Sequence, residues 1–96
     1  MLEENRFQSL ILSKKISNLL IKLGVLSREG SIEFDFDGHT YIFDMDAGEV
    51  SVSNEDNYDI SLDPDLPSNS DSVNPGRDYP DWVVYRLSHL YDFLKS

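Results

Sequence analysis

The strongest constraint on the fold is an alternation of apolar and polar side chains over residues 32–43, interrupted by Asp-Gly at positions 37–38. Alternation directs successive side chains of a strand to opposite faces, and Asp-Gly favours a two-residue hairpin turn. Because a shift of one residue would turn the apolar side chains toward water, the pattern predicts a hairpin with a single register. The predicted pairs are Phe36–His39, Asp35–Thr40, Phe34–Tyr41 and Ile32–Phe43.

The alternation continues beyond this hairpin and predicts further strands. A second turn centred on positions 47–48 would give the pairs Asp46–Glu49, Met45–Val50 and Phe43–Val52. One face of the sheet would then bury Ile32, Phe34, Phe36, Tyr41, Phe43, Met45, Val50 and Val52. A fourth strand is predicted over residues 58–62, where Tyr58, Ile60 and Leu62 alternate with polar residues.

Segments with helical spacing flank the predicted strands. Residues 2–23 carry apolar side chains three or four positions apart and are followed by Gly24, a residue typical of helix ends. Residues 80–94 show similar spacing and begin with a proline, which suits a helix start. Residues 63–79 contain three prolines and are predicted to form a mobile acidic loop. The sequence therefore predicts one α+β domain over residues 1–96, in which an N-terminal helix, a three- to four-stranded antiparallel meander and a C-terminal helix follow one another, with both helices on one face of the sheet.

The first predicted helix has more apolar surface than a small sheet can cover. One stripe consists of Leu12, Ile16, Leu19, Leu20 and Leu23, and a second stripe consists of Phe7, Leu10, Ile11 and Ile21. The sheet can cover one stripe, whereas the other needs the C-terminal helix or a second copy of the chain. We therefore expect a homodimer, formed through the surplus stripe of this helix or through the aromatic residues of the C-terminal helix.

Charge is distributed very unevenly along the chain. The 96 residues include 18 Asp and Glu against 8 Lys and Arg, and the 48 residues from Glu29 to Gly76 contain no Lys or Arg. The polar face of the predicted sheet would hold Glu33, Asp35, Asp37, Thr40, Ile42, Asp44, Asp46, Glu49, Ser51 and Ser53. Like charges on neighbouring strands destabilise a sheet. Because the chain retains a face with one sign of charge in spite of this destabilisation, we infer that the face has a function.

We predict that this acidic face binds a protein. The candidate binding residues are Glu33, Asp35, Asp37, Asp44, Asp46, Glu49, Glu55, Asp56, Asp59 and Asp63. Solubility is the alternative explanation for the acids. If the acids served only solubility, the helices should be acidic as well, whereas the segments predicted to be helical are slightly basic.

Composition argues against several functional classes. The chain has no cysteine, which excludes disulfides and thiolate metal sites. No apolar run approaches the ~18 residues of a membrane span, and the acidic N-terminus differs from a secretory signal. A net charge of −10 would repel the phosphates of nucleic acid. We therefore expect a cytoplasmic protein that binds neither membranes nor nucleic acid directly.

Few residues in the sequence could perform chemistry. His39 and His89 are the only histidines, and they do not have the spacing of a ligand pair. Residues 44–55 partly match a calcium loop, but Glu49 occupies the position that requires glycine. Acid–base catalysis by paired carboxylates needs a desolvated pocket, which an open sheet face does not supply. The sequence predicts no enzyme, no metal site and no cofactor.

In its size, its charge and its acidic span from Glu29 to Asp65, the chain resembles the small acidic DNA-mimic inhibitors, many of them phage-encoded. Such inhibitors occupy the DNA-binding surfaces of host proteins. Within this class the chain is most similar to a phage inhibitor of the histone-like nucleoid protein HU. The resemblance implies a basic, HU-like partner in the host cytoplasm whose DNA binding is blocked. Because these mimics share no sequence motif, the resemblance assigns no role to a particular residue.

Three other classes have some of the same features. An immunity protein that neutralises a basic nuclease toxin needs the same kind of acidic surface. A type III secretion chaperone is similar in its helix followed by an apolar–acidic hairpin, here residues 19–24 and 32–44, although such chaperones usually have further strands. A frataxin-like iron-binding protein also has helices around a sheet, but its acids lie mainly on the first helix.

Overall fold

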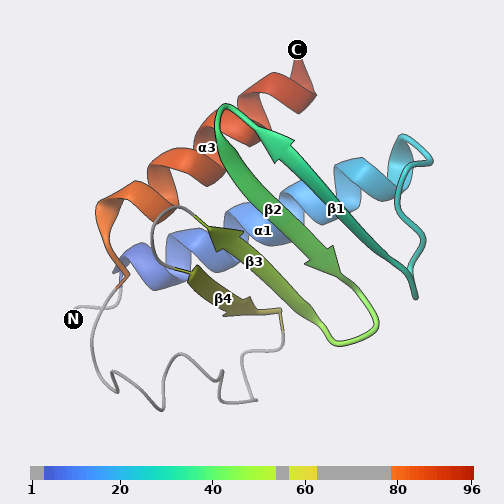
Figure 1. Ribbon diagram of the computed structural model, residues 1–96, viewed down its shortest axis with the longest axis horizontal. Coiled ribbons are helices and arrows are strands. Elements are labelled where there is room, and N and C mark those ends of the chain that lie inside the picture. The colour runs from blue at the N-terminus through green and yellow to red at the C-terminus, as the bar shows by residue number, and fades with distance from the viewer. Residues whose placement is uncertain (1–3, 54–56, 63–78) are drawn as a thin grey trace.

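The computed structural model describes residues 4–53, 57–62 and 79–96. Its elements are α1 (Glu4–Lys22), β1 (Ser31–Phe36), β2 (His39–Asp44), β3 (Glu49–Ser53), β4 (Asn57–Ser61) and α3 (Asp81–Lys95). The four strands form one antiparallel sheet in the order β1-β2-β3-β4. Both helices lie on the same face of this sheet (Figure 1). The predicted α+β arrangement is confirmed, with four strands.

The first hairpin has the predicted register, from Phe36 opposite His39 to Ile32 opposite Phe43. Its two turn residues, Asp37 and Gly38, have φ angles of 54° and 80°. Positive φ at both central positions is what a tight type I′ hairpin turn requires, and Asp and Gly tolerate it. The local sequence is therefore sufficient to fix this register.

The predicted register of the second hairpin is wrong by two residues. Asp44 rather than Asp46 lies opposite Glu49, and Phe43 lies opposite Val50. The turn contains four residues, 45–48, of which Gly48 has positive φ. The carboxylate of Asp44 accepts a 3.0 Å hydrogen bond from the backbone N–H of Ala47 and thereby stabilises this wider turn. Because side chains alternate with a period of two, a shift of two residues leaves the side chains that remain on strands on their predicted faces, while Met45 and Asp46 become turn residues.

The helices α1 and α3 run side by side in the same direction (Figure 1). At their starts the side-chain amide of Asn5 donates to the carboxylate of Asp81 at 2.7 Å. Two to three turns further along, the Lys15 ammonium lies 5.8 Å from the centre of the Tyr91 ring. Both pairs have the same separation in sequence, as expected for parallel helices.

The core lies between the helices and the inner face of the sheet. Its buried hydrophobic members are Ile16, Leu20, Leu26, Tyr41, Phe43, Val50, Val52, Ile60, Tyr79, Val83, Leu87 and Leu90. Of the eight residues predicted on the buried face, those from β1 and Met45 are only partly buried. Tyr79 was predicted to belong to a loop, but it is buried, and its hydroxyl donates to the backbone oxygen of Asp59 at 2.9 Å. The rest of that predicted loop, residues 63–78, lies outside the described residues.

The side of α1 that is fully buried includes Ile16 and Leu20 of the predicted stripe, but its other members are serines. It consists of Ser9, Ser13, Ile16, Ser17 and Leu20. Serine side chains are small, so they allow the helix to pack closely against its surroundings. The predicted stripe member Leu23 is mostly exposed, as is Phe7 of the second stripe. Within the described residues, neither helix has the length and apolar character needed to cross a membrane.

Candidate protein-binding surface

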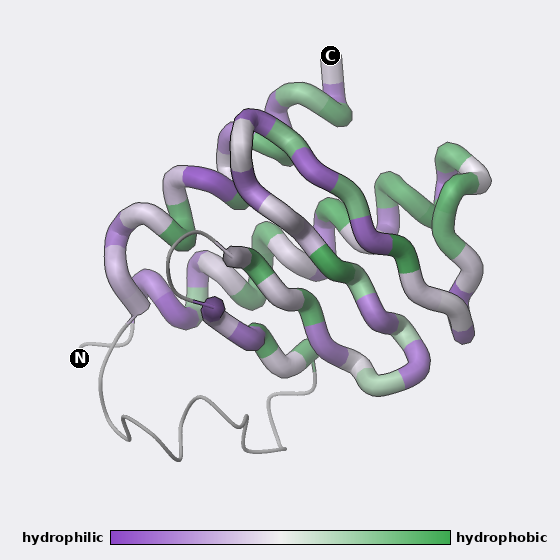
Figure 2. Tube along the Cα trace, viewed as in Figure 1, coloured by the Kyte–Doolittle hydropathy of each residue, from purple (hydrophilic) through white to green (hydrophobic). Residues whose placement is uncertain are grey.

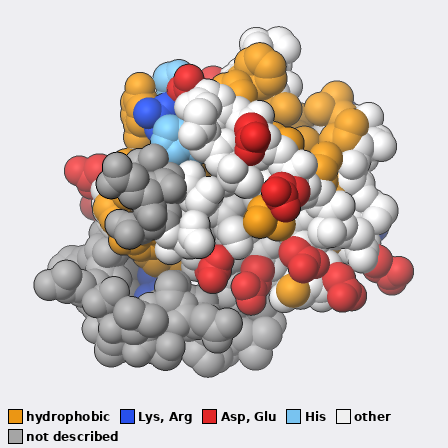
Figure 3. Space-filling model, viewed as in Figure 1, with side chains coloured by type: hydrophobic (Ala, Val, Ile, Leu, Met, Phe, Trp, Pro, Cys, Tyr) orange, Lys and Arg blue, Asp and Glu red, His pale blue; other side chains and the backbone are white. Residues whose placement is uncertain are grey.

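The face of the sheet turned away from the helices is an ordered array of polar side chains, which we call the open face. The strand registers arrange it in three rows across the sheet: Ser31–Asp44–Glu49–Ser61, Glu33–Ile42–Ser51–Asp59 and Asp35–Thr40–Ser53–Asn57. Carboxylates occur on all four strands, and none of these positions is basic. Figure 3 shows acidic side chains across this face, gathered toward the end where β2 turns into β3.

Sheet geometry fixes the spacing of the carboxylates on the open face. Neighbouring strands lie about 4.8 Å apart, and side chains two positions apart on a strand are separated by about 6.5–7 Å. Glu33 and Asp35 have the second spacing on β1, and Asp44 and Glu49 are direct cross-strand neighbours. The backbone positions of these charges are therefore fixed by hydrogen-bonded strands rather than by flexible chain.

Neutral hydrogen-bond donors hold three of these carboxylates in place. Asp35 accepts a 2.7 Å bond from the Thr40 hydroxyl, and Asp59 accepts a 2.7 Å bond from the Ser51 hydroxyl. Asp44 accepts from the backbone of the β2–β3 turn, as described above. A hydroxyl or amide donor orients a carboxylate without cancelling its charge. The open face therefore combines fixed geometry with retained negative charge.

Not every predicted binding residue belongs to the open face. Asp37 lies in the β1–β2 turn, where its carboxylate accepts a 2.7 Å charged hydrogen bond from Arg86 on α3. This ion pair holds the Asp37 carboxylate beside α3 and offsets part of its charge. Asp46 is exposed in the β2–β3 turn, beside the open face. The predicted residues Glu55, Asp56 and Asp63 lie outside the described residues.

None of the basic residues of the described chain lies on a strand of the sheet. Six of them are on the helices, namely Arg6, Lys14, Lys15, Lys22, Arg86 and Lys95, and Arg28 follows α1. The two layers therefore differ in charge, because the sheet layer exposes carboxylates and the helical layer carries the compensating bases. Such an asymmetry produces a directional field that orients an approaching charged partner.

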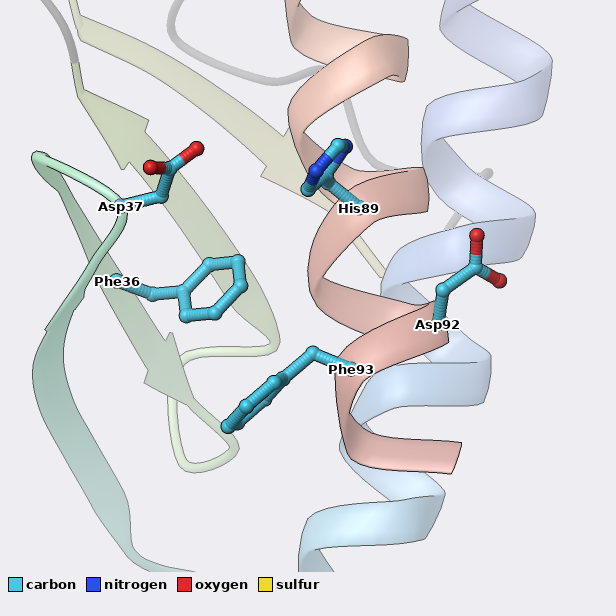
Figure 4. A pocket seen from close by; sticks show the side chains of 5 residues that line it. All are labelled: Phe36, Asp37, His89, Asp92 and Phe93. Atoms are coloured by element: carbon cyan, nitrogen blue, oxygen red, sulfur yellow. The ribbon is translucent and has the colours of Figure 1, made fainter. Parts of the chain in front are cut away.

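A shallow hollow of about 560 Å³ lies between the β1–β2 turn and α3. Figure 4 shows the rings of Phe36 and Phe93 directed toward each other across it, and their centroids are 4.9 Å apart. The other lining residues are Asp37, His89 and Asp92. Asp37 is already paired with Arg86. Among the residues that the structure describes, no three metal-ligating side chains come together here or elsewhere.

The two histidines have structural contacts. A ring nitrogen of His39 lies 2.9 Å from the backbone oxygen of Asp37, and the ring is nearly buried, 6.3 Å from that of Trp82. The His89 ring lies 5.1 Å from the Tyr85 ring on the surface of α3. The histidines thus lie on different elements, and each packs against an aromatic residue.

Comparison of the chain with models of protein families, with curated proteins and with solved structures gave no significant match. The geometry of the open face is therefore the basis for a functional proposal.

Proposed function

We propose that the chain is an acidic DNA mimic whose open face binds the DNA-contacting surface of a basic, HU-like nucleoid protein and blocks its DNA binding. The observation that supports this best is the distribution of Glu33, Asp35, Asp44, Glu49 and Asp59 over four adjacent strands without an intervening base. A surface that binds DNA is built to neutralise several closely spaced phosphates. Carboxylates on neighbouring positions of a rigid sheet, about 5–7 Å apart for the pairs Asp44–Glu49 and Glu33–Asp35, present such a surface with closely spaced negative charges.

Rigidity favours this mode of binding. The carboxylates of the open face are on hydrogen-bonded strands, and neutral donors already orient Asp35, Asp44 and Asp59. Binding therefore requires little further ordering of backbone or side chains, which is a major unfavourable term in association. The same charges repel DNA itself, so the mimic competes with nucleic acid for the partner without binding nucleic acid.

The test is a gel-shift competition between this chain and duplex DNA for an HU-type protein. The wild type should release DNA, and release should weaken as salt rises because exposed charges are screened beyond about 8–10 Å. Reversing Asp35, Asp44 and Glu49 to Lys should abolish release. The core is untouched because all three side chains lie on the open face, but the variant loses the bonds from Thr40 to Asp35 and from Ala47 to Asp44, so circular dichroism must show that it still folds.

The matched control changes Lys15 and Lys22 to Ala, which alters charge on α1 and leaves the open face unchanged. This variant should release DNA as well as the wild type. Equal release by the wild type and the triple reversal would contradict the proposal. Failure with HU-type proteins together with inhibition of a basic nuclease would instead assign the chain to the immunity proteins, and recovery of a secreted effector would assign it to the secretion chaperones.

A further inference from the structure

The strand β1 is an edge of the sheet and is less buried than its neighbour β2 at all six paired positions. Its apolar residues Ile32, Phe34 and Phe36 are only partly buried, whereas Tyr41 and Phe43 on β2 are completely buried. Its alternate residues, Ser31, Glu33 and Asp35, are exposed. Along β1, hydrophilic and hydrophobic positions alternate to the end of the strand (Figure 2). The helices therefore leave part of the inner face of β1 accessible beside its free edge.

The direction of the backbone groups on β1 follows from one hydrogen bond. The N–H of Met45 donates to the oxygen of Gly30 at 2.9 Å, which extends the β1–β2 ladder by one pair. In an antiparallel ladder, hydrogen-bonded pairs alternate with pairs that are not hydrogen-bonded. The even-numbered residues of β1 therefore bond to β2, and the N–H and C=O groups of Glu33 and Asp35 point outward. No strand among the described residues pairs with this edge.

The two sides of this edge differ in chemistry. On the side of the open face lie the exposed carboxylates of Glu33 and Asp35. Phe34 and Phe36 lie on the other side. The ring of Phe93, a residue that is 60% exposed, packs next to that of Phe36. An added strand would therefore have carboxylates beside one of its faces and aromatic rings beside the other.

We propose that the β1 edge binds an extended segment of the protein partner as a fifth strand, and that basic residues alternate with apolar residues in this segment. The segment's backbone would bond to Glu33 and Asp35, its basic side chains would approach their carboxylates, and its apolar side chains would cover Phe34 and Phe93. Strand addition to a free edge is a common mode of peptide recognition. This inference rests on the proposed function in one respect, namely that the partner is a basic protein.

A second copy of β1 is a poor occupant of the same edge. Antiparallel pairing of two β1 strands centred on Phe34 would place Glu33 of one copy opposite Asp35 of the other, twice in each dimer. Like charges directly opposite destabilise strand pairing, and charges on an edge strand are a common defence against self-association. The carboxylates therefore discriminate against the chain itself while they favour a basic strand.

Two peptides of equal composition test this inference. One alternates Lys and Val over about six residues, the length of a typical strand, and the other carries the same residues in two blocks. Since both have the same charge, general electrostatic attraction predicts equal affinity. We expect the alternating peptide to bind the full chain at least about tenfold more tightly in calorimetry. It should also slow hydrogen exchange at the amides of Glu33 and Asp35, and N-methylation of alternate peptide nitrogens should abolish both effects.

A pair of variants on α3 separates the edge from the rest of the surface. Phe93→Ser removes the aromatic wall without changing the open face and should weaken binding of the alternating peptide about tenfold. Tyr85→Ser removes another exposed aromatic ring of the same helix and should leave binding unchanged. Equal affinity for the two peptides, or unchanged exchange at Glu33 and Asp35, would overturn the inference even if DNA release is intact. Selective peptide binding without DNA release would instead overturn the proposed function alone.

Discussion

Asp44 and Glu49 lie directly opposite each other in the β2–β3 ladder, as the pair next to the turn. Two like charges in this position destabilise a sheet by roughly 0.2–1 kcal/mol. The backbone N–H of Ala47 orients Asp44 but supplies no positive charge. The pair is thus unfavourable for folding and, under the proposed function, favourable for binding.

We expect Glu49→Gln to raise the free energy of unfolding by roughly 0.2–1 kcal/mol at low salt while it weakens DNA release. Urea denaturation measures the first effect, and the gain should shrink as salt screens the pair. The control is Glu33→Gln, because Glu33 faces the neutral Ile42 across the ladder. It should weaken DNA release without a comparable gain in stability. Equal gains in the two variants would mean that the cross-strand pair is not the cause.

Two stacked phenylalanines should differ in their contribution to stability. The rings of Phe34 and Phe43 are parallel with centroids 6.0 Å apart, but only Phe43 is completely buried. Phe43→Ala should lower the free energy of unfolding by roughly 3–5 kcal/mol, enough to unfold a marginal domain. Phe34→Ala should lower it less, because part of that ring is already in contact with water. If the two variants lose the same free energy of unfolding in urea denaturation, Phe34 must be as well buried in solution as Phe43, which would mean that the β1 edge is covered.

The two hairpins show why one register could be predicted from the sequence and the other could not. A two-residue type I′ turn needs positive φ at both central positions. Asp37 and Gly38 adopt it, whereas at the second turn only Gly48 does, because Ala disfavours that conformation. The chain therefore uses a longer turn before Gly48. The faces were still predictable, because they depend only on the period of two.

Most of the open face followed from that period, but one pairing depended on a contact distant in sequence, and one buried stripe was hidden by its polar composition. The pairing of Asp37 with Arg86 joins residues 49 positions apart and has no local signal. The buried serines of α1 were missed because hydropathy ranks serine as polar, so the leucines were expected to face inward. Close helix packing favours small side chains, and the spacing of Ser9, Ser13 and Ser17 at every fourth position was the available signal.

The serine stripe gives a prediction about stability. The hydroxyls of Ser9 and Ser13 are buried and have no hydrogen-bond partner within the described structure. Ser13→Ala should raise the free energy of unfolding by about 1 kcal/mol, since it removes an unsatisfied polar atom and improves helix propensity. Ser17→Ala is the control, because the Ser17 hydroxyl already donates to the backbone oxygen of Ser13 at 2.8 Å. It should not give the same gain in the free energy of unfolding, since it removes a hydroxyl that has a partner. Ser13→Leu should be destabilising by about 1–3 kcal/mol through overpacking. A stable Ser13→Leu variant would contradict close packing on this side of α1.

Tyr41 makes stability sensitive to high pH. Burial raises the pKa of its phenol from 10.0 to about 12, Arg86 opposes this shift and Asp37 adds to it. Between about pH 10 and pH 12 the unfolded chain therefore loses the Tyr41 proton, whereas the folded chain keeps it. As a result, the free energy of unfolding should fall as the pH rises through this range. Below about pH 9 both states are protonated and this group should have no effect. Tyr41→Phe should remove this part of the decline in urea denaturation, and an identical decline in both proteins would contradict the assignment.

The exposed side of α1 predicts self-association. Phe7 is 60% exposed, and Ile11, one turn further along the same side, is only partly buried. An apolar surface of this kind is stabilised by contact with a second copy, so we expect a homodimer by light scattering at tens of micromolar. Phe7→Ser should give the monomer mass, whereas Phe93→Ser, at an equally exposed position on α3, should leave the dimer intact.

Dimer formation should also affect competition with DNA, because two linked open faces can engage an extended basic surface at higher effective concentration. Phe7→Ser should then release DNA less well than the wild type even though its open face is unchanged. A monomeric wild type at these concentrations, or full DNA release by a monomeric Phe7→Ser, would contradict the contribution of the α1 surface to function.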